Sequence, residues 1–480
     1  MADSATLLST LQDLDKIKAS AQTLHAVGAC AVCILRCAGV ALGPIYTHEP
    51  TDIKKSLGLD TSVETAPCPI CLDILSLAVL SQVASAYKAE GFDSLTVSVN
   101  IELPKAIYVR QRSAQIILGT KASLDVKDAA KYIVGIKISK DFQIHVDNES
   151  EMQVDVTFAH KETAEDHQFL IDREGSGIKT KTFRKHGVYH TTGDSKTAIL
   201  GELDKCSDAI IKDMFGSPPP SIKEPAQIES IVYRRSPLFI GGRYLKLERN
   251  ISQTPFIVEN KRMTELSVAE SIGEPIKKLV QCDSYNLVGS GREDADVRML
   301  GDGRPFYLEC TNPRKKVITQ EDLSAIQNEL IEKNFPVQVR RLQVIKPKDT
   351  SIIKEGEEHK TKHYCALVWF ASPLSKEVIA DINHKGSSEI VLQQKTPIRV
   401  LHRRAPLVRP KKLLRLEIAH LEDNFYKVRI ESEAGTYIKE FVHGDIGRTT
   451  PSLSSMAGDI TADILELDVE NVSLDFPPAL

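Results

Sequence analysis

The stretch from Gly289 to Pro313 reads G-S-G-R-E-D-A-D-V-R-M-L-G-D-G-R-P-F-Y-L-E-C-T-N-P, and its first half interleaves carboxylates with arginines. Gly289 and Gly291 let the backbone turn sharply just before Arg292. Residues 297–300 and 306–310 predict two strands joined by a turn at 301–303. A single carboxylate such as Asp294, offered from a loop beside arginines, suits a nucleophile or a base, and a turn-capping role also fits the spacing. A hydrated metal is disfavoured, because neighbouring guanidinium groups repel a divalent ion and occupy its oxygen ligands.

The run G-R-E-D-A-D-V-R, continued through G-D-G-R-P-F, resembles the catalytic-aspartate motif of the pseudouridine synthases, specifically the archaeal and eukaryotic tRNA pseudouridine synthases of the "Pus-ten" type. The resemblance implies that Asp294 is the catalytic aspartate. It also implies a multidomain α+β fold, with an N-terminal zinc-bearing and THUMP-like accessory region before a catalytic domain. The expected catalytic domain has a central mixed, mainly antiparallel sheet.

The overall composition is that of a soluble globular protein. The chain has 480 residues, enough for two or three domains, and 42% of them are hydrophobic and 26% charged. No apolar run approaches the ~20 residues that span a bilayer, and the N-terminus does not read as a secretory signal. We therefore expect a soluble, intracellular monomer without membrane association, in the nucleus, the cytoplasm or both. A net charge of −4 means that any binding to nucleic acid must depend on local basic patches.

Two C-x-x-C pairs, Cys30-Ala-Val-Cys33 and Cys68-Pro-Ile-Cys71, predict a metal site near the N-terminus. Two such pairs can place four thiolates at the corners of a tetrahedron around Zn²⁺, and four thiolates leave no open position for chemistry. The zinc would therefore be structural. Cys37 is a spare thiol that could replace one ligand, and unrelated core cysteines are the alternative. The resemblance also places a four-cysteine zinc site here.

We expect four parts along the chain. They are a helical segment with the zinc site (1–75), a THUMP-like RNA-binding accessory domain (76–216), a proline-rich linker (217–237) and the catalytic domain (238–480). An amphipathic helix is predicted over 204–214, just before the linker. The strands around 177–189 form a basic ribbon that suits either a phosphate backbone or an ordinary solvated hairpin.

Two later stretches supply candidate partners for Asp294. Tyr364 opens the apolar strand H-Y-C-A-L-V-W-F, and the resemblance implies that it stacks on the target uracil, an interaction worth ~1–3 kcal/mol. The sequence G-T-Y-I-K at 435–439 resembles a late motif of the synthases that modify the TΨC loop, which implies that Lys439 pairs with Asp294 and Tyr437 lines the pocket. A neighbouring cation keeps a carboxylate ionised. Without the resemblance, Tyr364 is a core aromatic and G-T-Y-I-K is a helix start with a surface lysine.

The chain carries no acidic residue from Val391 to Arg415, which is unusual in a mildly acidic protein. This run includes Q-K-T-P-I-R-V-L-H-R-R, and it predicts contact with the tRNA backbone, above all through Arg403 and Arg404. A solvated basic face is the alternative. Arg292, presented beside Asp294, is a further expected substrate-binding residue.

Together these features predict a tRNA pseudouridine synthase, an isomerase that uses an aspartate nucleophile. The reaction needs neither redox chemistry nor transfer to a second molecule, so we expect no organic cofactor. The resemblance implies the TΨC loop as the target, at tRNA position 55, with position 54 as a further candidate. The alternatives are a non-catalytic RNA-binding scaffold that retains a synthase domain, and a metal-dependent nuclease that uses Asp294, Asp296 and Glu309.

Overall fold

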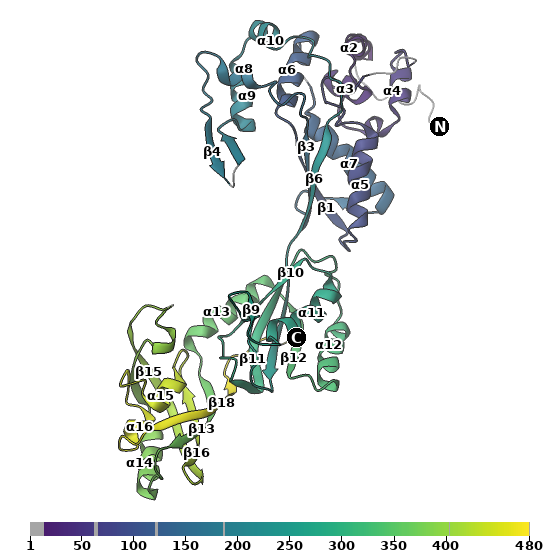
Figure 1. The fold of residues 1–480 in the computed structure, drawn as a ribbon. Coiled ribbons are helices and arrows are strands. Elements are labelled where there is room, and N and C mark those ends of the chain that lie inside the picture. Colours follow the sequence, from purple (N-terminus) through teal and green to yellow (C-terminus); the bar gives the residue numbers. More distant parts are fainter. Residues whose placement is uncertain (1–13, 62–65, 121–122, 186–187, 403, 480) are drawn as a thin grey trace. The chain divides into compact units, whose positions relative to one another are not determined.

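The computed structural model describes residues 14–61, 66–120, 123–185, 188–402 and 404–479 (Figure 1). The chain forms two compact units, residues 1–235 and 236–480. Each unit has a hydrophobic core of its own. Among the described residues, no helix combines the length and the apolar character that crossing a membrane requires.

The first unit is built on a four-stranded sheet with the order β2-β1-β3-β6. Strand β1 (Thr96–Glu102) pairs in parallel with β2 (His145–Val146) and β3 (Met152–Ala159), and β6 (Gln227–Arg235) pairs antiparallel with β3. Every second residue of β3 is buried, as expected for a strand with one face on the core. Helices α5 (Leu77–Ala89) and α7 (Val126–Phe142) pack against each other, and α7 packs on β1.

The remaining elements of the first unit surround this sheet. Before α5 lie α2 (Leu14–Ala26), α3 (Ala31–Cys37), the 3-10 helix η1 (Pro44–Thr47) and α4 (Pro50–Ser56). Later come α6 (Ala106–Leu118), α8 (Gln168–Asp172), the hairpin β4–β5 (Lys181–Lys185 and Val188–Thr192), α9 (Lys196–Lys205) and α10 (Asp208–Met214).

Three details of the first unit differ from what the sequence patterns lead one to expect. The helix predicted over 204–214 is two helices, because the Ser207 side chain accepts from the Ile210 N–H and starts α10. The cysteine-bearing segment shares one hydrophobic core with the sheet, as Ile34 and Val97 illustrate. The segment 217–237 contains strand β6, and the boundary between the two compact units falls between Arg235 and Ser236 along the chain. The division into four parts stays a prediction.

The second unit is built on a ten-stranded sheet. Nine of its strands follow the order β12-β7-β11-β18-β13-β16-β15-β14-β17, and the tenth, β10, pairs with β11. The strands run as follows: β7 Leu238–Lys246, β10 Ser284–Gly289, β11 Arg298–Thr311, β12 Val337–Ile345, β13 Lys362–Phe370, β14 Ile390–Lys395, β15 Val408–Glu422, β16 Phe425–Ser432, β17 Thr449–Thr450 and β18 Ala462–Val472. β11 and β18 pair in parallel, and the other pairings described in this sheet are antiparallel. This confirms the predicted mixed sheet within an α+β fold.

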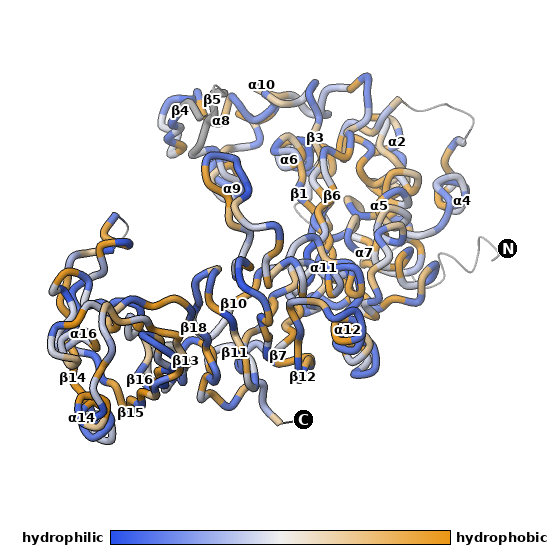
Figure 2. The backbone as a smooth tube through the Cα atoms, turned by 60° about the horizontal axis from the view of Figure 1, so that its bottom comes forward, coloured by the Kyte–Doolittle hydropathy of each residue, from blue (hydrophilic) through white to orange (hydrophobic). Residues whose placement is uncertain are grey.

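Helices cover this sheet with one apolar face each. α11 (Val268–Val280) packs on β10, α12 (Gln320–Glu332) on β12 and α14 (Lys376–Gly386) on β15. In Figure 2 hydrophobic and hydrophilic residues are intermixed along these helices, as one-sided burial requires. The shorter elements are the hairpin β8–β9 (Ile257–Val258 and Lys261–Arg262), η2 (Pro347–Asp349), α13 (Thr350–His359), η3 (Ile398–Val400), α15 (Ile438–His443) and α16 (Leu453–Met456).

The prediction of two strands joined by a turn at 301–303 is wrong, because β11 is one strand through this segment. Met299 pairs with Lys246 and Arg304 with Tyr244, so the chain continues along β7 instead of reversing. The glycines produce a bulge between these pairs: φ is 60° at Gly301 and 83° at Gly303. A Cβ on Gly301 would lie 1.9 Å from the Glu470 carbonyl oxygen, so the close approach to β18 requires glycine there.

Arg243 is buried in the second unit and hydrogen-bonds both the C-terminal segment and the bulge. Its guanidinium is 2% exposed and donates hydrogen bonds to five backbone carbonyl oxygens, those of Val472, Leu474, Phe476, Asp302 and Gly303. Buried carbonyl oxygens need donors, and Arg243 supplies one to each of these groups. The Val472 oxygen also accepts from the Leu474 N–H over 2.9 Å.

We predict that Arg243→Met lowers the free energy of unfolding of the second unit by about 3 kcal/mol or more, because buried carbonyl oxygens lose their donors. The only tryptophan, Trp369, lies in β13 of this unit, so its fluorescence during urea unfolding measures the change. Arg341→Met removes an exposed arginine that pairs with Asp302 and is expected to change stability by less than about 1 kcal/mol. Equal losses for both variants would contradict the role of Arg243.

Candidate active site

Asp294 lies on the loop 290–297, which connects β10 to β11 where β11 begins to pair with β18. Neighbouring side chains of this loop point in opposite directions. The Glu293 side chain is 2% exposed, whereas that of Asp294 is 44% exposed. The loop therefore inserts one carboxylate into the protein and presents the next one to solvent.

The inserted carboxylate of Glu293 is bound on both oxygens. Arg304 of β11 donates through Nε to Oε2 over 2.7 Å, and the Tyr244 hydroxyl of β7 lies 3.0 Å from Oε1 and 2.9 Å from Oε2. Arg304 and Tyr244 are themselves buried. Lys246 Nζ lies 3.9 Å from Oε1 as a second, more distant cation. A charged pair buried with these additional hydrogen bonds keeps a fixed geometry, because separating the partners inside the protein is costly.

Buried donors also hold the backbone of the loop. The Lys246 ammonium at the end of β7 is fully buried and donates to the carbonyl oxygens of Ile251 (2.8 Å), Asp294 (2.9 Å) and Ala295 (3.2 Å). Gln253 Nε2 donates to the Gly291 oxygen over 3.0 Å, and Arg304 Nη1 to the Ser290 oxygen over 2.8 Å. Burial lowers the pKa of Lys246, and the charge of Glu293 acts against this shift. Four carbonyl groups of the loop, those of Ser290, Gly291, Asp294 and Ala295, thus have fixed partners. Because the backbone is held, the direction of the Asp294 side chain is restricted.

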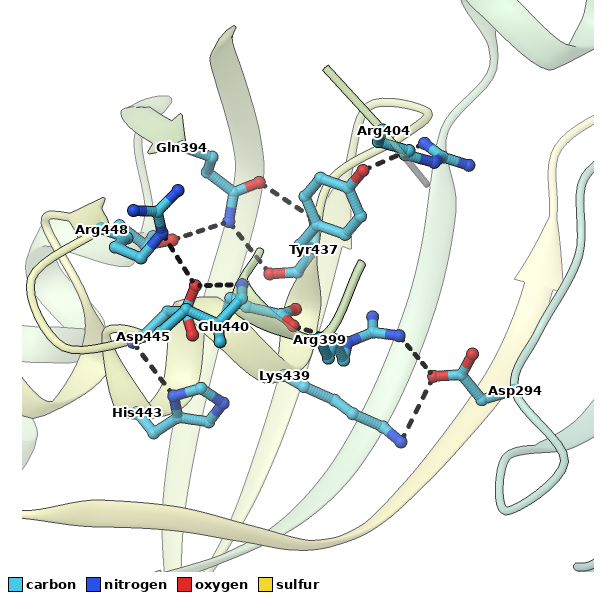
Figure 3. A network of polar contacts seen from close by, with 12 residues as sticks. Asp294, Gln394, Arg399, Arg404, Tyr437, Lys439, Glu440, His443, Asp445 and Arg448 are labelled. Atoms are coloured by element: carbon cyan, nitrogen blue, oxygen red, sulfur yellow. Dashed lines mark hydrogen bonds and ion pairs between the residues drawn. The ribbon is translucent and has the colours of Figure 1, made fainter. Parts of the chain in front are cut away.

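Two cations contact the same oxygen of Asp294 (Figure 3). Arg399 Nη1 donates to Oδ2 over 3.2 Å, and Lys439 Nζ lies 3.4 Å from it. Lys439 also donates to Asp296 Oδ2 over 2.7 Å. Burial alone would raise the pKa of Asp296, but the hydrogen bond and charge of Lys439 bring it below its ordinary value. The structure therefore brings together Asp294 and Lys439, which are 145 positions apart in the printed sequence.

Tyr437 precedes α15 and is fixed by its backbone. Its N–H donates to Gln394 Oε1 and its carbonyl oxygen accepts from Gln394 Nε2, each over 3.0 Å. Its hydroxyl accepts a hydrogen bond of 3.0 Å from Arg404 Nη1, so Arg404 contacts a neighbour of the Asp294 site (Figure 3). Arg292 is exposed on the Asp294 loop, and Arg403 lies outside the described residues.

Tyr364 lies in β13, between β18 and β16. Burial raises the pKa of its hydroxyl to about 12, with Arg304 acting against the shift and Glu293 adding to it. Tyr364 is therefore neutral at physiological pH and lies near the buried pair that holds the Asp294 loop. It also lines a cavity of about 300 Å³ with residues of β13, β15, β16 and β18, and Asp294 is not among the lining residues.

Sequence reasoning missed Arg399 and Glu440 as members of this site. Arg399 was included in the basic run assigned to the tRNA backbone, but its side chain lies between Asp294 and Glu440. Spacing alone could not separate it from the other arginines of that run. The nuclease alternative is weakened here, because Lys439 contacts both Asp294 and Asp296, where a metal would need free carboxylates.

The four predicted cysteines form a cluster in the first unit. The sulfur atoms of Cys30, Cys33, Cys68 and Cys71 all lie within 4.8 Å of one another. The Cys33 N–H donates to Cys30 Sγ over 3.4 Å, and the Cys30 N–H to Cys68 Sγ over 3.3 Å, as backbone groups do around bound thiolates. The donor set fits a soft metal ion in tetrahedral geometry. Cys37 is buried and is not part of the cluster.

We predict that Lys246→Met loosens the loop 290–297, because two of its carbonyl oxygens, those of Asp294 and Ala295, lose a buried donor. Hydrogen–deuterium exchange of the loop amides should become about tenfold faster or more, which corresponds to ~1.4 kcal/mol. Lys333→Met removes an exposed lysine that pairs with Glu329 on α12 and serves as the control. Unchanged exchange in the loop of Lys246→Met would contradict the structural role of this ammonium.

Comparisons with known proteins match both units of the chain. The family model described as "Pus10, C-terminal" matches residues 239–473, and the one described as "Eukaryotic Pus10, N-terminal" matches residues 68–232. The chain is 32% identical to "tRNA pseudouridine synthase Pus10" of Mus musculus, with 96% of this chain and 98% of the relative covered. It is 35% identical to the protein of the same name from Homo sapiens, with 86% and 79% covered.

A chain of the solved "Crystal Structure of a Cbf5-Nop10-Gar1 Complex" is 17% identical, with 48% of each chain covered and a TM-score of 0.28. The matches to the two family models fall on both units, and the mouse relative is covered almost from end to end. The resemblance drawn from the sequence is confirmed: this chain belongs to the Pus10 family.

Proposed function

We propose that this protein isomerises uridine to pseudouridine in tRNA, with Asp294 as the reacting carboxylate. The relatives from mouse and human are both named tRNA pseudouridine synthases and align with most of this chain. The observation that carries the proposal is the geometry of Asp294. Its carboxylate is offered from a loop held by buried donors, and two cations lie at one of its oxygens.

The isomerisation breaks the bond between uracil N1 and the sugar C1′ and forms a bond between C5 and C1′. The proton leaves C5 and N1 regains one, so atoms and electrons balance without a second substrate. A carboxylate near the sugar can attack the sugar or the ring, or remove a sugar proton. Each of these routes requires a carboxylate within reach of the nucleotide, and Arg399 and Lys439 contact one oxygen of Asp294.

The remaining site residues would hold the substrate. Tyr364 and Tyr437 would contact the uracil outside the base stack, and a neutral tyrosine ring suits stacking. Arg292, Arg403 and Arg404 would contact the RNA near the target nucleotide. We place the target uridine in the TΨC loop, at position 55 and with position 54 as a further candidate, as the family resemblance implies.

The first unit would bind RNA as a THUMP-like accessory domain, and its cysteine cluster would hold Zn²⁺. Four thiolates saturate a tetrahedral ion, so the metal would hold the N-terminal segment together and supply no chemistry. Buried Arg36 supports this assignment, because its Nε donates to Cys33 Sγ over 3.3 Å and offsets negative charge at the cluster. A non-catalytic RNA-binding scaffold is the alternative function, and the contacts of Asp294 with Arg399 and Lys439 favour catalysis over it.

We predict that Asp294→Asn abolishes pseudouridine formation, with a loss of at least about 10³-fold, because the amide cannot act as nucleophile or base. Mapping pseudouridine by carbodiimide labelling and primer extension, in tRNA incubated with purified protein, measures this at each position. Binding of tRNA should change little. If the variant bound tRNA and still formed pseudouridine at the wild-type rate, a different catalytic residue would follow. If the wild-type protein bound tRNA and formed no pseudouridine, the scaffold alternative would follow.

A second prediction concerns the metal. Purified protein should contain about one zinc ion per chain by elemental analysis. Cys68→Ser should lose most of it and lower the melting temperature of the first unit, because metal binding contributes to folding. Cys206→Ser, a buried cysteine outside the cluster, should retain the metal. Equal zinc content in the two variants would contradict the assignment.

A further inference from the structure

Arg399 belongs to the basic run of residues 391–415, and its side chain contacts Asp294. It lies in the 3-10 helix η3, and its guanidinium contacts two carboxylates from different parts of the second unit. Nε donates to Glu440 Oε1 over 2.6 Å, and Nη1 donates to Asp294 Oδ2 over 3.2 Å (Figure 3). With two different nitrogens engaged, the plane of the guanidinium is fixed between these carboxylates.

Glu440 is an unusual neighbour, because it is a buried carboxylate with few partners. Its side chain is 3% exposed, and its Oε2 has no hydrogen-bond partner within the described part of the chain. Burying a carboxylate is costly, and Arg399 is the cation that compensates it here. Burial alone would lower the pKa of Arg399, but the hydrogen bond to Glu440 and the charges of Glu440 and Asp294 raise it, so the guanidinium stays charged.

The backbone on either side of Arg399 is also anchored. The Ile398 N–H donates to Asp445 Oδ2 over 3.2 Å, and Arg448 Nη2 donates to the Thr396 carbonyl oxygen over 2.7 Å. The Thr396 hydroxyl accepts from the Leu407 N–H over 3.1 Å, which closes the base of the loop 396–407. The Arg399 side chain is itself 42% exposed, and the anchored backbone on both sides of it favours a fixed position beside Asp294.

The two cations approach Asp294 on the same side. Arg399 and Lys439 both lie at Oδ2, and no hydrogen bond to Oδ1 occurs among the described residues. Glu440 follows Lys439 directly on α15. The helix α15 therefore supplies Lys439 directly, and it supplies Glu440, which holds the guanidinium of Arg399.

We infer that Arg399, oriented by Glu440, is a positioning residue for Asp294: it fixes Oδ2 so that Oδ1 faces the substrate. Glu440 acts through Arg399 and does not touch the substrate. This inference deepens the proposed function and rests on it. It changes the assignment of Arg399 from the tRNA backbone to the reacting carboxylate.

The test separates chemistry from binding. Single-turnover rates of pseudouridine formation are measured with saturating enzyme and a radiolabelled tRNA transcript, and dissociation constants for the same RNA are measured by filter binding. We expect Arg399→Met to lower the single-turnover rate about 10²-fold while the dissociation constant changes less than about threefold. Arg399→Lys should recover part of the rate, because a charge remains without the bidentate geometry.

The link to Glu440 is tested by a double-mutant cycle. Glu440→Gln keeps the size of the side chain and should lower the single-turnover rate about tenfold. The variant with both Arg399→Met and Glu440→Gln should be no slower than Arg399→Met alone, because Glu440 has no route to Asp294 without the guanidinium. Urea unfolding followed by Trp369 fluorescence establishes that each variant is folded. Arg341→Met, an exposed arginine paired with Asp302, is the matched control and should keep the wild-type rate.

Two results would overturn the inference. Arg399→Met with a weakened dissociation constant and a wild-type rate at saturation would make Arg399 an RNA-binding residue. Losses in the two single variants that multiply in the double variant would separate Glu440 from Arg399. A wild-type protein that forms no pseudouridine would contradict the proposed function itself, whereas an active wild type with an equally active Arg399→Met contradicts only the role of Arg399.

Discussion

The buried pair of Glu293 and Arg304 is the interaction on which the candidate site depends. It joins the Asp294 loop to β11, and Tyr244 completes the hydrogen bonds of the carboxylate from β7. Without Arg304, Glu293 would retain only one cation among the described residues, Lys246, whose Nζ lies 3.9 Å from Oε1, so the loop has little freedom to adopt another conformation. The rigidity of this short polar loop thus comes from contacts of its own Glu293 and of its backbone with buried polar groups of β7 and β11. A catalytic carboxylate benefits from this arrangement, because its orientation is fixed before the substrate binds.

The sheet explains why residues so distant in sequence meet at Asp294. β11 pairs antiparallel with β7 and β10 along most of its length, and at its start it pairs in parallel with β18. The Asp294 loop lies at this junction between the two halves of the sheet. From the second half, α15 contributes Lys439 and Glu440, and the loop after β14 contributes Arg399. Each half alone would hold either the carboxylate or its cations, so the site exists only when the whole second unit is folded.

Much of this organisation could be predicted from the sequence, and the limits have physical causes. The cysteine cluster followed from spacing, because C-x-x-C pairs restrict geometry locally. The strand pattern and the Asp294 loop were also predictable, since burial alternates along strands. The prediction at Gly301 and Gly303 was wrong, because a glycine pair with positive φ fits both a turn and a bulge. Only the pairing of β11 with β7 decides between the two. Arg399 could not be singled out, since its partner Glu440 lies about forty positions away and the choice among neighbouring arginines is made by tertiary packing.

The central claim is that a fixed Asp294 carboxylate, held at Oδ2 by Arg399 and Lys439, faces the sugar of an extruded uridine. A crystal structure of the full chain with a tRNA that carries a non-reacting uridine analogue at position 55 tests this most directly. We expect Asp294 Oδ1 to lie about 3–3.5 Å from a reacting atom of that nucleotide while both cations remain at Oδ2. A target nucleotide bound away from Asp294, or an Asp294 side chain that turns from Arg399 and Lys439 to another partner, would contradict it.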